Sequence, residues 1–203
     1  MQRTIISMLI LGGIFLIGQG VYMDAKAKIA QVLISSSWDS RTIDSAPAKP
    51  WWWADTRVIA RMDVPRLKET VYVMQDDSGE SLAFGPGHMP ASDTPSSNGH
   101  VVIAGHRDSH FGFLKEIKVG DLISTENNQA NKKRYRVTEV TVINSNEQEI
   151  LLLEDSQLTL ITCYPFDDFI PGGPLRLIVN AEPVTRTDDH PHRGKPNILS
   201  LSY

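Results

Sequence analysis

The sequence contains a single cysteine, Cys163, among its 203 residues. An intramolecular disulfide is therefore excluded, and so is a structural zinc site built from several cysteines. Three roles are left for the thiol: packing as a small hydrophobic side chain, ligation of a metal, and chemistry. The cysteine alone does not decide between a buried packing residue and a nucleophile.

Dense runs of lysine and arginine are also absent. The chain has 20 basic and 24 acidic residues, a formal net charge of -4 and a pI near 5.8. Such a composition gives no general attraction to nucleic acid. The histidines form no helical HExxH pattern, so we expect no metal site and no cofactor.

Charged residues are missing from one long stretch, Ile5 to Met23. About 20 apolar residues cross the hydrocarbon core of a bilayer as a helix, so this stretch predicts a membrane anchor. Ala25-Lys26-Ala27 resembles a cleavage site and leaves a cleaved signal peptide as the alternative. The basic residues on the two sides of the stretch nearly balance, so the positive-inside rule does not fix its orientation.

The rest of the chain is long enough for one core but not two, since 41% of the residues are hydrophobic and 22% are charged. We expect a membrane anchor at 1–24, an amphipathic segment and linker at 25–50, a folded domain at 51–184 and a disordered tail at 185–203. The linker itself begins at Ser35. Trp51-Trp52-Trp53 is interpreted as packing on the domain, as a membrane-interface element or as a lid over a groove.

The segment 51–184 consists of short β-like runs separated by turn residues. The strand candidates are 57–64, 69–74, 101–104, 134–143, 158–162 and 175–179, and the helical candidate is 111–117. Many strands at this spacing, with one brief helix, predict an all-β barrel or sandwich.

Cys163 follows the apolar run 158–162 and precedes Tyr164-Pro165. Proline cannot donate to a sheet ladder, so the strand is expected to stop near the cysteine and to leave its thiol at a strand mouth. This position suits chemistry, and burial as a small hydrophobic residue is the alternative.

Two more side chains fit a reaction at that thiol. His106 follows the run 101–104, and an imidazole can hold or accept the proton of a thiol. Arg176 lies among apolar residues of a later strand, and its guanidinium can donate to a carbonyl oxygen that becomes negative. Taken alone, His106 is more often structural or solvated, and Arg176 is equally an outward-facing surface arginine.

Together the three residues resemble the sortase family of cysteine transpeptidases. Thr159-Leu160-Ile161-Thr162-Cys163 matches the TLxTC signature of that family, Gly105-His106-Arg107 matches its histidine motif, and Arg176 follows in the family's order. The resemblance covers nearly all of residues 51–184. It implies an eight-stranded sortase-type β-barrel with short helices, behind an N-terminal transmembrane helix.

A finer resemblance concerns the sortases of Gram-negative bacteria, class GN. It is carried by strings such as Leu82-Ala83-Phe84-Gly85-Pro86-Gly87-His88 and Ile103-Ala104-Gly105-His106-Arg107-Asp108. It implies a single-pass protein of the inner membrane with its catalytic domain in the periplasm.

The activity implied by the resemblance is cleavage of an LPxTG-like C-terminal sorting signal on a secreted protein. Cys163 would form a thioester acyl-enzyme that is transferred to an amine acceptor, with His106 as acid and base and Arg176 as oxyanion stabiliser. The partners implied are the secreted protein, the amine acceptor and the membrane.

Three further residues are supporting candidates. Thr162 offers a hydroxyl beside the nucleophile, Asp108 can orient His106 or Arg107 or cap the helix near 111, and His88 lies on a loop that can approach the groove. Ordinary strand or loop roles are the alternatives for each.

Two other functions are alternatives for this chain. An L,D-transpeptidase-like cell-wall enzyme also uses cysteine and histidine, but its cysteine normally follows Ser-x-Gly, whereas Thr162 precedes Cys163 here. A non-catalytic, membrane-tethered interaction domain is the alternative from another class.

Overall fold

The computed structural model of the protein describes residues 2–43, 46–47, 49–147, 155–168 and 173–184. The elements are α1 (Gln2–Asp39), β1 (Val58–Val64), β2 (Glu69–Met74), α2 (Gly79–Phe84), β3 (Gly87–His88), β4 (His100–Gly105), the 3-10 helix η1 (Gly112–Glu116), β5 (Leu122–Asn127), β6 (Lys132–Asn144), β7 (Gln157–Cys163) and β8 (Leu175–Pro183). The tail expected at 185–203 lies outside the described residues.

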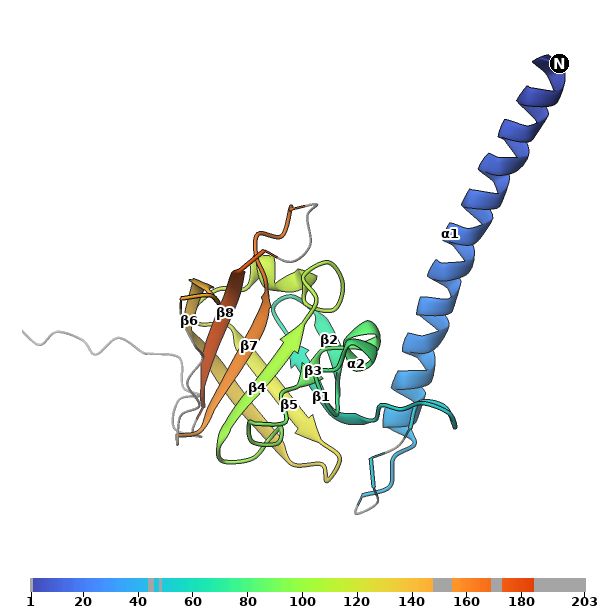
Figure 1. The fold of residues 1–203 in the computed structure, drawn as a ribbon. Helices are drawn as coiled ribbons and strands as arrows, with labels where there is room; N and C mark the ends of the chain where they lie inside the picture. Colours follow the sequence, from blue (N-terminus) through green and yellow to red (C-terminus); the bar gives the residue numbers. More distant parts are fainter. Residues whose placement is uncertain (1, 44–45, 48, 148–154, 169–172, 185–203) are drawn as a thin grey trace, which may run out of the picture.

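The strands form one closed barrel in the order β1-β2-β3-β4-β7-β8-β6-β5 (Figure 1). β4 pairs in parallel with β7, and β2 with β3, whereas the other neighbouring strands are antiparallel. The eight-stranded all-β barrel confirms the fold predicted from the sequence.

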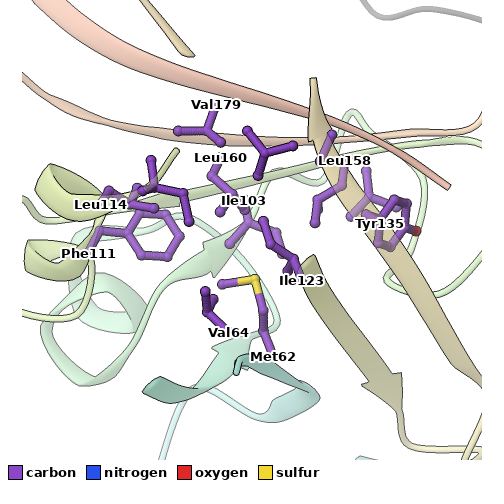
Figure 2. Packing of buried hydrophobic residues seen from close by; sticks show 14 of the residues in the cluster. Met62, Val64, Ile103, Phe111, Leu114, Ile123, Tyr135, Leu158, Leu160 and Val179 are labelled. Carbon is purple, nitrogen blue, oxygen red and sulfur yellow. The ribbon is translucent and has the colours of Figure 1, made fainter. Parts of the chain in front are cut away.

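Alternation along the strands fills the barrel with apolar side chains. In β1, Ala60, Met62 and Val64 are fully buried, while the residues between them are half-buried. Ile103 and Leu160 join them in the cluster seen in Figure 2. Full burial of a large apolar side chain stabilises the fold by about 1.5–3 kcal/mol, so this cluster fixes the strands that carry the candidate site.

A smaller apolar cluster lies on the outer face of β4, β7 and β8. It consists of Val102, Ile161 and Ile178, and Met89 and Ile143 pack against it. β7 is buried on both faces, since its five central residues are all buried, and these five are leucine, isoleucine and threonine.

The two ends of the barrel carry different segments. At the upper end in Figure 1, β4 ends at Gly105, β7 ends at Cys163 and β8 begins at Leu175. At the lower end, β4 begins at His100, and the β5–β6 hairpin turns at 128–131.

α1 is a single helix of 38 residues. The serine-rich sequence predicts a linker from Ser35 onward, and this prediction is wrong as far as Asp39, where the helix ends. The physical reason is tertiary: Ile34 and Trp38 lie one turn apart and are buried against the barrel. Packing of an apolar stripe stabilises a helix that a serine-rich sequence does not predict.

The N-terminal part of α1 extends away from the barrel (Figure 1). Among the described residues, α1 is the one helix long and apolar enough to cross a membrane, and its apolar side chains from Ile5 to Met23 are exposed. This agrees with a span or a signal sequence at the N-terminus.

The tryptophan run lies beside α2, a short helix that the sequence analysis did not predict. Ser78 is the N-cap of α2 and accepts a hydrogen bond from the Ser81 amide at 3.3 Å. Trp51 packs edge-on against Phe84 with ring centroids 4.9 Å apart, which agrees with the packing interpretation. Trp52 remains 85% exposed.

Candidate functional site

Cys163 and Arg176 are cross-strand partners at the upper end of the barrel. Cys163 is the last residue of β7, Arg176 is the second residue of β8, and their Cα atoms pair in the antiparallel ladder. Directly opposed residues project to the same face of a sheet, and here it is the outer face, which also carries Ile161 and Ile178. The half-buried Cys163 and the Arg176 side chain therefore leave the sheet on the same face.

His106 comes immediately after β4 at the same end. β4 and β7 run in parallel with Gly105 opposite Thr162, so the next position on each strand is His106 and Cys163. The His106 carbonyl accepts hydrogen bonds from the Phe111 amide at 3.1 Å and the Ser109 amide at 3.4 Å, which fixes the turn that follows. The imidazole is exposed at the mouth of this turn.

Glycine is required before His106 by close packing. A Cβ atom at Gly105 would come within 2.7 Å of the Phe111 ring, which is fully buried. The missing side chain lets Phe111 close the upper end of the core directly beneath His106.

The Arg176 guanidinium is held by the main chain at the start of β8. Nη1 donates to the Gly173 carbonyl at 2.5 Å and to the Leu175 carbonyl at 2.9 Å. These contacts keep the positive charge at the upper end of the barrel.

Thr162 connects the two strands that carry the thiol and the imidazole. Its Oγ1 donates to the Gly105 carbonyl at 2.8 Å, and the side chain is 2% exposed. Thr162 therefore both precedes the candidate nucleophile and contacts the residue before His106.

Arg107 belongs to the motif Gly105-His106-Arg107, and the sequence alone predicts no role for its side chain. Its side chain is 7% exposed and donates from Nη1 to the Pro165 carbonyl at 2.6 Å and from Nη2 to the Asp168 carbonyl at 2.5 Å. The residue after His106 thus holds the segment that follows Cys163. The sequence offers one signal, the place of Arg107 beside His106, and this signal does not identify its carbonyl partners.

The structure also places the two remaining supporting candidates. Asp108 pairs with Arg107 at 3.4 Å, which agrees with the expected contact to that residue, while its own side chain is 73% exposed. The alternative role as a helix cap is wrong, because the N-cap of η1 is Phe111. His88 is buried in β3, where Nε2 donates to the Asp93 carbonyl at 2.9 Å. Its contacts are those of a structural histidine.

Two hollows adjoin the turn after His106. One of about 490 Å³ is lined by Arg107, Asp108 and Phe166, and one of about 250 Å³ is lined by Gln31, Ser109 and His110. Burial lowers the pKa of His110, a hydrogen bond with Ala83 opposes this, and the charge of nearby His106 lowers it further. His110 is therefore neutral beside the candidate acid and base near pH 7.

Within the described ranges, no group of three histidine, cysteine, aspartate or glutamate residues is arranged to hold a metal ion. The strand register brings a cysteine, a histidine and an arginine to one end of the barrel, a set of side chains suited to nucleophilic catalysis.

Comparison with known proteins connects this geometry to a family. Residues 62–184 match the family model described as the Sortase domain. Sortase D of Bacillus subtilis (strain 168) is 24% identical over 200 residues, which cover 91% of this chain and 100% of that protein.

Solved structures show the same fold. Sortase A from Corynebacterium diphtheriae aligns with a TM-score of 0.58 and 22% identity, covering 82% of this chain and 86% of that one. A Clostridium perfringens Sortase D5 transpeptidase aligns with a TM-score of 0.56 and 23% identity, covering 64% and 80%.

Proposed function

Because the chain belongs to the sortase family of cysteine transpeptidases, we propose that it cleaves an LPxTG-like sorting signal near the C-terminus of a secreted protein and joins the new carboxyl end to an amine. The observation that carries this proposal is the pairing of Cys163 with Arg176 at the strand ends, with His106 at the next position of the neighbouring strand.

The first half-reaction forms a thioester. The Cys163 thiolate attacks the scissile carbonyl carbon, and the carbonyl oxygen becomes an oxyanion that accepts hydrogen bonds from the Arg176 guanidinium. The carbon–nitrogen bond then breaks as His106 gives its proton to the leaving amine. The acyl group stays on sulfur, and His106 is left neutral.

The second half-reaction transfers the acyl group. An acceptor amine attacks the thioester carbonyl, and neutral His106 takes the proton that this amine loses. The sulfur leaves as thiolate and restores the starting pair. Arg176 stabilises the second oxyanion as it does the first.

The sheet behind the thiol is held by a buried apolar cluster. Val102, Ile161 and Ile178 pack together on the outer face of β4, β7 and β8, the face from which Cys163 and Arg176 project. This packing fixes the strand ends that carry the thiol and the guanidinium, which supports attack on a peptide carbonyl in one defined geometry.

The proposed location is a membrane, with residues 5–23 of α1 as a single span and the barrel in the periplasm. The long apolar helix supports the span. The class GN assignment and the inner membrane rest on sequence strings such as those around His88 and His106. The matched relatives are named sortases A, C1, D and D5, so they add no support for class GN.

A direct test uses a fluorogenic LPxTG-like peptide with hydroxylamine as the acceptor. The wild-type chain should release the leaving fragment and form a peptide hydroxamate, and Cys163→Ala should do neither while keeping its melting temperature. Turnover by Cys163→Ala would remove the proposed nucleophile. No turnover of any sorting peptide by wild type, together with no alkylation of Cys163, would favour the non-catalytic interaction domain.

The L,D-transpeptidase alternative is disfavoured by the family match over residues 62–184. Turnover of a peptidoglycan stem peptide, with none of the sorting peptide, would restore it.

A further inference from the structure

The second half of α1 is docked on the barrel. Gln31 donates from Nε2 to the Phe84 carbonyl at 2.8 Å, and Ile34 and Trp38 are 0% and 2% exposed in a cluster with Val58 and Met74. Each such apolar burial contributes about 1.5–3 kcal/mol, so the helix is held firmly along this length.

A further contact fixes the end of the helix. Arg41 follows α1 by two residues, lies 3.7 Å above the Trp38 ring and pairs with Glu126 at 2.5 Å. The two side chains of this ion pair are only 16% and 17% exposed. The helix and the barrel therefore form one unit rather than a domain on a flexible stalk.

The direction of α1 relative to the barrel follows from the same contacts. Glu126 adjoins the β5–β6 hairpin at the lower end, whereas Gln31 lines a hollow with Ser109 and His110, close after His106 at the upper end. From Arg41 back to Gln31 the helix runs from the lower to the upper end, and residues 5–23 continue beyond it (Figure 1).

We propose that the docked helix makes the catalytic end of the barrel face the surface of the bilayer that holds residues 5–23. This inference rests on the proposed membrane anchor and on the proposed sortase site. A helix of 38 residues is about 57 Å long, nearly twice the roughly 30 Å hydrocarbon core, so its second half stands outside the membrane.

The candidate site lies close to the surface of the bilayer. Gln31, which reaches the hollow beside His110, is eight residues after Met23, or about 12 Å along the helix. The phospholipid headgroups therefore lie opposite the upper end of the barrel. A sorting signal or an acceptor amine held at the membrane reaches Cys163 directly, whereas a free peptide must enter the gap between barrel and bilayer.

Orientation is measured with the full chain in lipid nanodiscs that carry fluorescence acceptors on their headgroups. A thiol-reactive donor is attached to Cys163 at the upper end, or to Gln129→Cys in a Cys163→Ser background at the lower end. The two positions differ by the height of the barrel, about 15 Å for a seven-residue strand tilted by roughly 40°. Stronger energy transfer from Cys163 is expected, and equal or stronger transfer from position 129 would overturn the proposal.

A flexible insertion separates orientation from catalysis. About eight Gly and Ser residues after Ala27 leave the docked residues 31–41 and the span intact but uncouple them. The difference in energy transfer should disappear. Cleavage of a sorting signal tethered to a membrane-spanning helix should fall about tenfold, while turnover of the soluble peptide should not fall, because the barrel no longer faces the bilayer.

A rigid insertion at the same place is the matched control. Two helical turns, about seven residues and about 10 Å, raise the barrel without uncoupling it, so the difference in energy transfer should persist. Unchanged cleavage of the tethered signal after the flexible insertion would contradict the proposal. If the sortase proposal fails, the soluble peptide is not turned over, although the difference in energy transfer between the two labelled positions is retained. If the anchor proposal fails, the chains do not enter the nanodiscs.

Discussion

Arg107 donates a hydrogen bond from Nη1 to the carbonyl oxygen of Pro165 at 2.6 Å. This contact joins the residue after the candidate acid and base to a residue two positions after the candidate nucleophile. A buried guanidinium that donates to main-chain carbonyls fixes the position of its own segment relative to theirs, because its charge and its planar N–H donors all need hydrogen-bond partners.

Replacement of Arg107 by Gln should slow the reaction more than it weakens peptide binding. Hydrogen bonds from charged groups contribute about 1.5–3 kcal/mol, so a loss of about 2 kcal/mol in unfolding free energy is expected. Misalignment of His106 and Cys163 should lower kcat at least about tenfold with little change in KM. Steady-state kinetics with the sorting peptide measure this split.

Arg57→Gln is the matched control. Arg57 also donates from Nη1 to a proline carbonyl at 2.6 Å, that of Pro47, but it precedes β1, away from the strand ends that carry the site. Its kcat should equal that of wild type. Equal losses of kcat in both variants would show that Arg107 acts through overall stability alone.

Thr162→Val should lose the hydroxyl that bonds the Gly105 carbonyl, at nearly constant volume. A buried carbonyl left without its donor costs about 1–3 kcal/mol, so the urea midpoint and kcat should both fall. Thr162→Ser keeps the donor and should recover most of both. A serine variant as poor as the valine variant would indicate that the methyl group, and not the hydrogen bond, is what matters.

Gly105→Ala should displace Phe111, since the new Cβ would approach its ring to 2.7 Å. Overpacking of this kind costs about 1–3 kcal/mol, and the shift reaches His106 through the adjacent turn. Both the melting temperature and turnover should decrease. Gly79→Ala is the control, because nothing lies within 4 Å of its added Cβ, and an unaffected Gly105→Ala would show that Phe111 relaxes freely.

Acidification should destabilise the barrel through His100. Burial lowers the pKa of this histidine from its ordinary value of 6.5, and its Nε2 lies 2.8 Å from Thr159 Oγ1. Thr159 donates its own proton to Asn180, so neutral His100 is the donor in this pair.

The sign follows from proton binding. His100 takes up a proton near pH 6.5 in the unfolded chain, but only at lower pH in the folded chain. Its contribution to the unfolding free energy is therefore complete above pH 6.5 and is lost as the pH falls below that value. Melting temperatures between pH 8 and pH 5 should decline. His100→Gln should flatten this decline, and an equally steep decline in that variant would assign it to other groups.

Arg176→Lys should be severely impaired in turnover. An ammonium group retains the charge but cannot hold the Gly173 and Leu175 carbonyls while also presenting a planar fork to an oxyanion. A fall in kcat of about a hundredfold is expected, the scale of losing one oxyanion donor. Near-normal kcat would remove Arg176 from the mechanism.

The sequence predicted most strands because their apolar runs end at turn residues, as at β1, β2 and β7. β5 was missed because Leu122–Asn127 is mostly polar, and β3 because two residues give no pattern. The helical segment 35–39 was assigned to a linker because its burial depends on distant residues of the barrel.

The candidate site was partly accessible from the sequence. The order of His106, Cys163 and Arg176 was visible in the motifs, and the register now places them at one end of the barrel. Their catalytic roles stay predictions. The contacts of Arg107 were not predictable, because its carbonyl partners lie 58 and 61 residues away along the chain.

In the proposed reaction Cys163 carries the acyl group. Intact-protein mass spectrometry after brief mixing with an LPxTG-like peptide, quenched in acid, measures this adduct directly. We expect a mass increase equal to the N-terminal peptide fragment, located on Cys163, lost on addition of hydroxylamine and absent from Cys163→Ala. Peptide cleavage without any adduct on Cys163, or an adduct on another residue, would contradict it.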